Sequence, residues 1–460
     1  MQCSVVIPCH NGVALTKACI ESLLQQTHCR PCEILLVDNA SQDATENLAA
    51  MDPCVRVLRQ SRNLGFAGGV NVGIRAAREP FVLVLNNDTQ AAPNLLVELH
   101  AALAADPRIG AVAPVSNHVK GPALLAIGNR GRDGSERAAI ATELASSPVR
   151  SQDVDTLAGL CLLVRRATFA EVGLFDERFG HGNFEDDDFC LRLRLAGCRL
   201  VIARRAFLHH EGHATFRALG LDLRDEIGQR RVQFIAKWQN DPAGRATIAA
   251  MHGDLVGAAA AAEEALRIWP RWPDAEWHLG RWRAARGEHD RAAVHFRALL
   301  RLCPQHAETA VELGCSLLAM GETDQASDQL AATVQTCHLA EPLQVRLHQQ
   351  LGEHAYRAGR SEAAANEFVS ALELAPEDAV LQNWLGLCRL QQGELAAATT
   401  AFAAAADHGF ALAHTNLGIC LHQLGRRTDA KACFAKAVEL LPHDPVARAN
   451  FAALKEASAV

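Results

Sequence analysis

The chain has 460 residues, 49% of them hydrophobic, so it can bury two or three domain cores and is not globally disordered. Its formal net charge of -7 argues against general nucleic-acid binding. The opening residues lack the pattern of a signal peptide, and no apolar run reaches the roughly 18 residues of a membrane span. With 15 cysteines expected as free thiols, these features predict a cytoplasmic protein without a transmembrane segment.

Short apolar runs alternate with helix-like stretches up to about residue 225. Strands are expected at 3–7, 33–37, 55–59, 82–86 and 111–114, and helices at 14–26, 43–51, 69–77 and 93–106. This alternation predicts an α/β domain with a Rossmann-like, mostly parallel sheet and right-handed crossovers. The stretch 121–152 is rich in Gly, Arg and Ser and is expected to form a loop.

A different pattern begins after about residue 235, where strands vanish and Ala and Leu dominate. Each copy contains a Leu-Gly pair. Counted from the Leu of that pair, a Gly follows 8 residues later, an Ala 13 residues later, and a Phe or Leu 17 residues later. This pattern resembles the tetratricopeptide repeat, a helix-turn-helix unit of about 34 residues. We expect small residues where the two helices touch and the large residue in the gap between them. The Leu-Gly pairs recur at spacings of 34, 38, 34 and 32 residues, at 279/280, 313/314, 351/352, 385/386 and 417/418.

The two patterns predict two domains, an α/β domain over 1–235 and an all-α repeat solenoid over 236–460 with five to six repeats. Stacked repeats of this kind form an elongated superhelix with a concave face. We expect that face to bind an acceptor, a partner protein or a second copy of the chain. A structural spacer or a dimerisation element remains the alternative.

Polar and acidic clusters follow the apolar runs of the first half. Asp38 follows the second run, and Asn86-Asn87-Asp88 ends the fourth. A third cluster, 185–188, leads a helix-like segment and consists of four consecutive acidic residues. Carboxylates at the carboxyl ends of parallel strands line the crevice where open α/β sheets bind ligands. This arrangement suits a metal ion and a phosphate-bearing substrate.

With these motifs, residues 3 to about 216 resemble the inverting family 2 glycosyltransferases. The resemblance implies a GT-A fold, a nucleotide-diphosphate-sugar donor and a divalent cofactor, Mn²⁺ or Mg²⁺. It implies a hydroxyl acceptor on a surface polysaccharide, a lipid-linked glycan or a protein, which leaves peripheral association with the inner membrane face open. The matching segments are 5–11, 36–43, 63–71, 85–89, 173–177, 184–192 and 208–216.

The resemblance also assigns residues to the donor nucleotide. Asp38 would bond the edge of the base. Gly69 would let the backbone approach the donor at the start of a helix, whose N-terminus favours phosphate charge. The residues expected around the nucleotide are Pro8, His10, Asn11, Asp38, Asn63, Gly69, Asn71 and Asn87.

Asp88 matches the metal-binding carboxylate of the family's DxD motif. The first carboxylate of that motif is replaced by the amide of Asn86, which lowers the negative charge of the site. His210 is expected to supply an imidazole to the metal or to the phosphates, with His209 as the second choice. Gly159 and His209 are expected near the acceptor or the transferred sugar.

Asp186 is the expected general base, because an inverting transfer needs one carboxylate to remove the proton of the acceptor hydroxyl as it attacks C1. Adjacent like charges raise one another's pKa, so Asp188 and Glu185 remain rival candidates. The same acidic run also suits a helix N-terminus that is stabilised by the helix dipole alone.

Two other functions fit part of the pattern. A catalytically weak scaffold that binds nucleotide sugars and acts through its repeats would explain the amide at Asn86, whereas Asp38, Asp88 and Asp186 favour an enzyme. Nucleotidyl transfer also uses carboxylates on a Rossmann-like sheet. It requires a Gly-rich phosphate-binding signature on the first strand–helix turn, which 10–13 does not supply.

Overall fold

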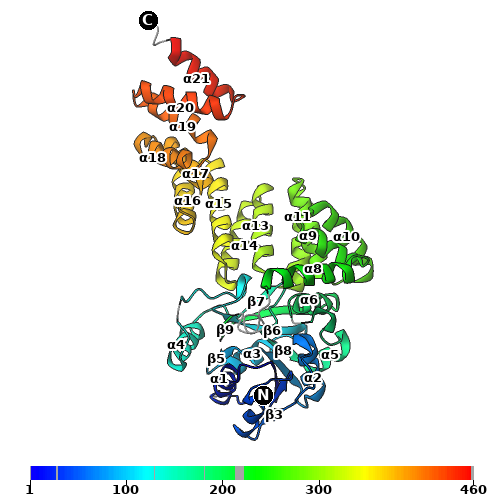
Figure 1. Cartoon of the computed structure of the whole chain (residues 1–460). Coiled ribbons are helices and arrows are strands. Elements are labelled where there is room, and N and C mark those ends of the chain that lie inside the picture. Colours follow the sequence, from blue (N-terminus) through cyan, green and yellow to red (C-terminus); the bar gives the residue numbers. More distant parts are fainter. Residues whose placement is uncertain (1, 27–28, 129, 181, 213–221, 457–460) are drawn as a thin grey trace. The chain divides into compact units, whose positions relative to one another are not determined.

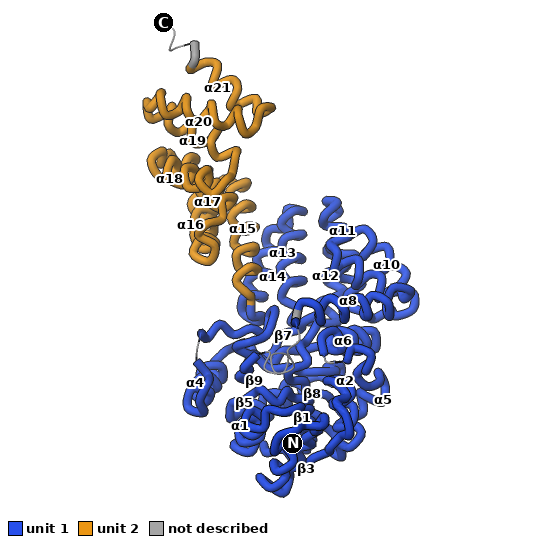
Figure 2. Tube along the Cα trace, in the orientation of Figure 1, with its two compact units in different colours: residues 1–338 blue, residues 339–460 orange. Residues whose placement is uncertain are grey.

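The computed structural model (Figure 1) describes residues 2–26, 29–128, 130–180, 182–212 and 222–456. The chain forms two compact units, residues 1–338 and residues 339–460 (Figure 2). The first unit contains a sheet, its covering helices and the first repeat helices, and the second contains repeat helices. The helix α8 (Leu223–Trp238) spans the position 235/236 at which the domain boundary is expected. Part of the family-like segment 208–216 lies outside the described residues.

A nine-stranded sheet forms the centre of the first unit, in the order β3-β2-β1-β4-β8-β6-β9-β5, with β7 paired to β9. Among the described strands, four pairs are parallel and four are antiparallel. The α/β class and the five expected strands are confirmed, but the sheet is mixed rather than mostly parallel. The strands are β1 Cys3–Cys9, β2 Glu33–Asp38, β3 Val55–Val57, β4 Phe81–Leu85, β5 Thr89–Ala91, β6 Ile109–Ser116, β7 Ser151–Val154, β8 Cys161–Arg165 and β9 Arg199–His210.

The apolar pattern missed β5, β7, β8 and β9, each of which takes part in an antiparallel pair. β7 and β9 carry charged residues that are paired inside the fold. Arg199 of β9, for example, holds both carboxylate oxygens of Asp153 in β7, at 2.7 and 2.8 Å. The expectation of a loop over 121–152 is also wrong, because helix α4 (Gly134–Ala145) occupies its centre. The Asp133 side chain caps this helix by accepting the Glu136 N–H at 2.8 Å.

Helices cover both faces of this sheet. Val5 and Ile7 of β1 pack in one apolar cluster with residues of α1 and α3, and Val6 packs in another with residues of α2 and α6. Because successive side chains of a strand point to opposite faces, a strand covered on both sides needs an uninterrupted apolar run. The covering helices are α1 Val13–Leu24, α2 Gly65–Ala76, α3 Leu95–Ala104, α5 Arg166–Val172 and α6 Glu185–Leu195, with 3-10 helices η1 Ala44–Ala50, η2 Gly121–Ala123 and η3 Glu177–Phe179.

The repeats are antiparallel helix pairs. A Cβ on the Gly of each Leu-Gly pair would lie 2.4 to 2.8 Å from the Phe or Leu sixteen residues later, so the expected contact of small and large residues is confirmed. Among the described residues, no helix has both the length and the apolar character needed to cross a bilayer. The helices are α9 Pro242–Met251, α10 Leu255–Ile268, α11 Pro273–Ala285, α12 His289–Leu302, α13 Ala307–Ala319 and α14 Thr323–Thr336 in the first unit, and α15 Glu341–Arg357, α16 Ser361–Leu374, α17 Ala379–Gln391, α18 Leu395–Asp407, α19 Ala411–Gln423, α20 Arg427–Leu440 and α21 Pro445–Glu456 in the second.

The close approach of helices within a repeat predicts the effect of one added methyl group. Gly386→Ala would place a Cβ 2.6 Å from the Phe402 ring. We expect a loss of about 1–3 kcal/mol in the free energy of unfolding, measured by urea denaturation, although Ala favours a helix. The matched control is Gly228→Ala in α8, where an added Cβ meets nothing within 4 Å. That variant should gain about 0.5–1 kcal/mol, and equal gains in both variants would contradict the tight contact.

Candidate active site at the edge of the sheet

The carboxyl ends of β1 and β2 form one side of the site. The Asp38 carboxylate is fully buried, accepts the Ser41 N–H at 2.8 Å and pairs with Arg59 Nη1 at 2.8 Å. Asn11 adopts a left-handed conformation with φ 57°, and its side-chain oxygen accepts the Gln42 N–H at 2.8 Å. These contacts join the turn after β1 to the turn after β2.

Gly69 of α2 lies against the same strand ends. A Cβ at this position would lie 2.8 Å from Asn39 Nδ2 and 3.2 Å from Pro8 Cβ, so a glycine allows this approach. His10 Nδ1 lies 2.7 Å from the Asn39 carbonyl oxygen. The structure therefore gathers Pro8, His10 and Gly69 with Asn11 and Asp38 at one edge of the sheet.

The three other residues expected at the nucleotide make their contacts within the protein. Asn63 Oδ1 accepts the backbone N–H at the start of α2 at 2.9 Å. Asn71 is 1% exposed; its amide donates to the Phe175 carbonyl at 2.8 Å and accepts the Phe175 N–H at 3.0 Å. Asn87 Nδ2 donates to Thr16 Oγ1 at 3.0 Å. Asn71 in particular fixes the 173–177 segment rather than facing a ligand.

Strand register brings Asp88 and His210 together. Thr89 of β5 is paired with His210 of β9, and the Glu211 N–H donates to the Asp88 carbonyl at 3.0 Å. His210 Nε2 lies 3.3 Å from Asp88 Oδ1. His210 Nδ1 lies 2.9 Å from the His118 carbonyl, which can only accept, so this nitrogen carries a proton and the Nε2 of a neutral ring keeps its lone pair.

This pair fits a divalent cation in its chemistry. A carboxylate oxygen and a neutral imidazole nitrogen are ligands that Mn²⁺ accepts, and Asp88 alone suits Mg²⁺. Among the described residues, no group of three or more His, Cys, Asp or Glu is arranged to hold a metal. Further ligands would have to come from phosphate oxygens or water. Burial lowers the pKa of His210, but the hydrogen bond and charge of Asp88 outweigh it and raise that pKa, so protons compete with a cation for this nitrogen.

The acidic run 185–188 forms the first turn of α6, as expected. Two left-handed residues precede it, Asn183 with φ 74° and Phe184 with φ 68°. Left-handed backbone is strained for residues with a side chain, and such strain clusters at functional sites. The chain thus enters α6 through a turn that the surrounding structure must hold in place.

Asp186 and Asp187 are held by hydrogen bonds from a neighbouring loop. Asp186 Oδ2 accepts the Gly159 N–H at 2.8 Å, and Asp187 Oδ1 accepts the Thr156 hydroxyl at 3.2 Å. Burial raises the pKa of Asp186. Burial and the charge of Asp186 together raise the pKa of Asp187 to about 7. Both carboxyl groups therefore titrate closer to neutral pH than an ordinary aspartate.

The two rival candidates for the base have different surroundings. Asp188 is fully buried, accepts the Trp238 indole N–H at 2.9 Å and is ion-paired with Lys237. Glu185 is 5% exposed and its Oε2 has no hydrogen-bond partner among the described residues. Burial and the charge of Asp186 raise the pKa of Glu185 well above its usual range. These contacts favour Asp186 over Asp188 and Glu185.

Gly159 connects the acidic turn to the Asn86-Asn87-Asp88 motif. The Asn86 N–H donates to the carbonyl of Leu160 at 2.9 Å, directly beside Gly159. A Cβ on Gly159 would lie 3.3 Å from Asp186 Cβ. The first turn of α6 is therefore anchored next to the end of β4, which leads into Asp88.

His209 lies apart from the Asp88–His210 pair. Successive residues of a strand point to opposite faces, so His209 and His210 project from opposite sides of β9. His209 Nε2 lies 3.2 Å from Glu211 Oε1, and its side chain is buried. Burial lowers the pKa of His209. The structure brings His210, but not His209, to Asp88, the carboxylate that is expected to bind a metal.

Several residues at the site were not identified from the sequence. Arg59 ends an expected strand, and Asp187 lies inside the acidic run, so their positions were available but not their contacts. Thr156 belongs to no recognisable motif. Lys237 and Trp238 lie in α8, beyond the family-like segment, and only the folded chain brings them to Asp188.

Comparison with known proteins agrees with both halves of this architecture. Residues 4–170 match the family model "Glycosyl transferase family 2", and residues 350–409 and 411–444 match tetratricopeptide repeat models. The N-acetylglucosaminyl-diphospho-decaprenol L-rhamnosyltransferase of Mycobacterium tuberculosis is 35% identical over 214 residues, which are 41% of this chain and 69% of that protein.

Two further relatives are much longer than their matched part. An uncharacterized protein of Sinorhizobium fredii is 30% identical over 224 residues, 46% of this chain and 24% of that protein. The O-antigen biosynthesis protein RfbC of Myxococcus xanthus is 28% identical over 221 residues, 45% of this chain and 17% of that protein. The chain thus spans a quarter or less of these two relatives and more than two thirds of the mycobacterial enzyme.

The raised pKa of Asp187 predicts how stability depends on pH. The folded state holds this proton up to about pH 7, whereas an unfolded Asp releases it near pH 4. The contribution of the protonated group is therefore fully present below about pH 4 and is lost as the pH rises to 7. At pH 7.5, Asp187→Asn should be more stable than the wild type by roughly 1–4 kcal/mol in the free energy of unfolding. At pH 5 this difference should be smaller.

Urea denaturation at the two pH values measures this difference. The matched control is Asp328→Asn on the exposed face of α14, which makes the same substitution away from the acidic turn. A difference between Asp187→Asn and the wild type that is the same at pH 5 and pH 7.5 would contradict the raised pKa.

Proposed function

We propose that this chain, which belongs to glycosyltransferase family 2, transfers a sugar from a nucleotide-diphosphate-sugar donor to a hydroxyl acceptor with inversion at C1. One observation carries the proposal. The Asp88–His210 pair and the Asp186 carboxylate are anchored to the same end of β4 and its neighbour β8, through the adjacent backbone contacts of Leu160 and Gly159. This arrangement supports a metal–phosphate site and a general base at one edge of the sheet, as a displacement at C1 requires.

The donor nucleotide is proposed to lie over the ends of β1 and β2. Asp38 would bond the base edge, while Arg59 holds one oxygen of that carboxylate in place. Pro8, His10 and Gly69 surround the same region. A Mn²⁺ or Mg²⁺ ion held by Asp88 and His210 would offset the charge of the departing diphosphate.

Asp186 is proposed as the general base. Its carboxylate takes the proton of the acceptor hydroxyl while the oxygen forms a bond to C1. The bond from C1 to the donor phosphate oxygen breaks on the opposite side, and its electron pair leaves with the nucleoside diphosphate. No covalent sugar–enzyme intermediate forms. The raised pKa of Asp186 strengthens it as a base, and the N–H of Gly159 keeps one oxygen oriented.

The acceptor is proposed to be a glycan hydroxyl, with a lipid-linked glycan as the first choice to test. The mycobacterial relative is named for rhamnosyl transfer to an N-acetylglucosaminyl-diphospho lipid. A polysaccharide or a protein presented by the repeats is the other possibility. With a lipid-linked acceptor, a cytoplasmic enzyme would act at the inner face of the membrane.

The scaffold alternative has less support. A protein that only binds nucleotide sugars has no need of Asp186 in a strained, buried turn with a raised pKa. The cost of maintaining such a turn is explained by catalysis.

The experiment that tests the proposal is release of nucleoside diphosphate from a panel of UDP-, dTDP- and GDP-sugars. It is run with Mn²⁺, with Mg²⁺ and with chelator, and with and without an N-acetylglucosaminyl-diphospho lipid. We expect release from one donor, stimulated by metal. If no donor is cleaved under any condition and no nucleotide binds in calorimetry, the proposed function is wrong.

Asp186→Asn separates the base from donor binding. We expect kcat to fall by about 10²- to 10⁴-fold. The Kd for the nucleoside diphosphate should be unchanged, because the proposed nucleobase contacts lie at the ends of strands β1 and β2 rather than in α6. Asp187→Asn is the matched comparison, since it removes a neighbouring charge of the same turn. If Asp187→Asn abolishes turnover and Asp186→Asn does not, the base is Asp187.

A further inference from the structure

Two segments determine where the proposed base lies. One is the acceptor turn, residues 185–188 at the start of α6. The other is the loop between β7 and β8, which donates to Asp186 from Gly159 and to Asp187 from Thr156. Each of these segments is also held by residues that belong to the repeat region of the first unit.

Helix α8 holds the acceptor turn through Asp188. The buried Asp188 carboxylate accepts the Trp238 indole N–H at 2.9 Å and is ion-paired with Lys237. Lys237 Nζ also donates to Asp176 at 2.8 Å, so the ammonium group is fixed from two sides. Arg192 of α6 pairs with Asp188 Oδ2 at 2.9 Å, whereas Lys237 and Trp238 both bond Oδ1. Without them a buried carboxylate oxygen loses these partners, which is strongly disfavoured. Lys237 and Trp238 therefore constrain a residue two positions from Asp186.

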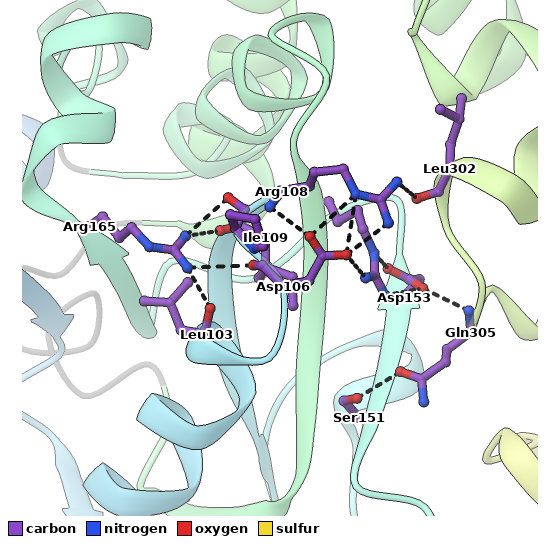
Figure 3. A network of polar contacts seen from close by, with 11 residues as sticks. Leu103, Asp106, Arg108, Ile109, Ser151, Asp153, Arg165, Leu302 and Gln305 are labelled. Carbon is purple, nitrogen blue, oxygen red and sulfur yellow. Dashed lines mark hydrogen bonds and ion pairs between the residues drawn. The ribbon is translucent and has the colours of Figure 1, made fainter.

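The connection between α12 and α13 holds strand β7, which leads into the β7–β8 loop (Figure 3). The Gln305 N–H donates to Asp153 Oδ2 at 2.8 Å, the Asp153 N–H donates to the Gln305 carbonyl at 3.2 Å, and the Ser151 hydroxyl donates to Gln305 Oε1 at 2.7 Å. The next residue of the connection, His306, places Nε2 3.1 Å from Asp155 Oδ1. Asp155 precedes Thr156, so this anchor lies one residue from the hydroxyl that bonds Asp187.

One buried guanidinium links the two anchors. Arg194 of α6 is 1% exposed and donates to the Val154 carbonyl at 3.0 Å. It also lies 3.1 Å from Asp155 and is ion-paired with Asp274 of α11. Trp272 fixes Asp274 by donating its indole N–H to Oδ2 at 3.0 Å. Helix α6, the β7–β8 loop and a repeat helix therefore share one charge network.

We propose that Lys237 and Trp238, acting through Asp188, are positioning residues for the proposed transfer reaction, and that His306 acts in the same way through Asp155. They do not touch the reacting atoms. They hold the acceptor turn and the loop that hydrogen-bonds it, so that the Asp186 carboxylate is presented in one orientation. The catalytic part of this chain then includes helix α8 and the first repeat helices up to α13, whatever the second unit binds.

This inference changes where the chain can be shortened. A cut at 235 would remove Lys237, Trp238 and His306 together with the network at Asp274. A cut after 338 keeps the first compact unit complete. We expect loss of order in the acceptor turn in the first case and its retention in the second.

Hydrogen–deuterium exchange on the full chain tests the positioning role without any ligand. In Trp238→Phe and in Lys237→Met we expect faster exchange, by on the order of tenfold or more, in peptides that cover 153–160 and 183–190. Peptides from β1 and β2 should be unchanged, which separates local loosening from global unfolding. Lys237→Arg should restore the wild-type exchange, because it keeps the charge.

The matched control is Trp282→Phe in α11. Trp282 packs at the edge of the same apolar cluster as Trp238, and its indole faces Arg283 and Arg286 rather than α6. This variant should leave both peptides unchanged. Equal exchange in Trp238→Phe, Lys237→Met and the wild type, or the same increase in Trp282→Phe, overturns the proposal.

The kinetic test rests on the proposed function and uses the donor that the wild type cleaves. Trp238→Phe should lower kcat by about 10- to 100-fold with the donor KM unchanged, and Trp282→Phe should leave both unchanged. An unaltered kcat in an active protein overturns the catalytic consequence. If the wild type cleaves no donor, the proposed function fails, while the exchange experiment still decides whether these residues order the acceptor turn.

Discussion

Four consecutive carboxyl groups must fit into one partly buried helical turn at the start of α6, and the surrounding structure depends on how their charge is accommodated. Four negative charges in so small a volume repel one another strongly where water is excluded. The fold reduces this repulsion by placing the four carboxyl groups in three different environments. Asp188 is paired with cations, Glu185 is buried with a strongly raised pKa, and Asp186 and Asp187 are left with raised pKa values and a few hydrogen bonds. Burial thus leaves these last two groups more readily protonated than ordinary aspartates, Asp187 with a pKa of about 7.

Residues from distant parts of the chain are needed to accommodate these charges. Asp188 is paired with Arg192 of its own helix, and α8 adds a second cation in Lys237 and an indole N–H in Trp238. The Asp88–His210 pair is brought together in a different way. Asp88 and His210 meet because the register of β5 against β9 brings them together. One half of the site therefore follows from strand pairing within the sheet, and the other half follows from packing between the sheet and the repeats.

The parts of this site that follow from local pattern could be predicted from the sequence, and the parts that follow from long-range packing could not. Apolar runs predicted β1, β2 and β4, and polar residues after them predicted Asp38 and Asp88. The resemblance to a family added His210, although strand β9 that carries it was not predicted, because its charged side chains interrupt the apolar pattern. Asn71 was expected at the donor from its place in a Gly-rich motif, whereas its amide bonds to the Phe175 backbone and to the Glu177 carboxylate. Side-chain direction at such a position depends on a partner about a hundred residues away, which no local pattern contains.

The repeats show that one sequence pattern can serve two physical purposes. In every copy a Gly lets the two helices touch over a large side chain, so each pair of helices is stable by the same contact. In the first unit, Asp274 and His306 of the repeats and Trp238 of α8 also bond to the α/β part. These repeats therefore hold two sets of contacts at once, the packing of helix on helix and the bonds that fix the acceptor turn and the β7–β8 loop. A substitution at Asp274 or His306 acts on the loop and the turn as well as on the repeat that carries it.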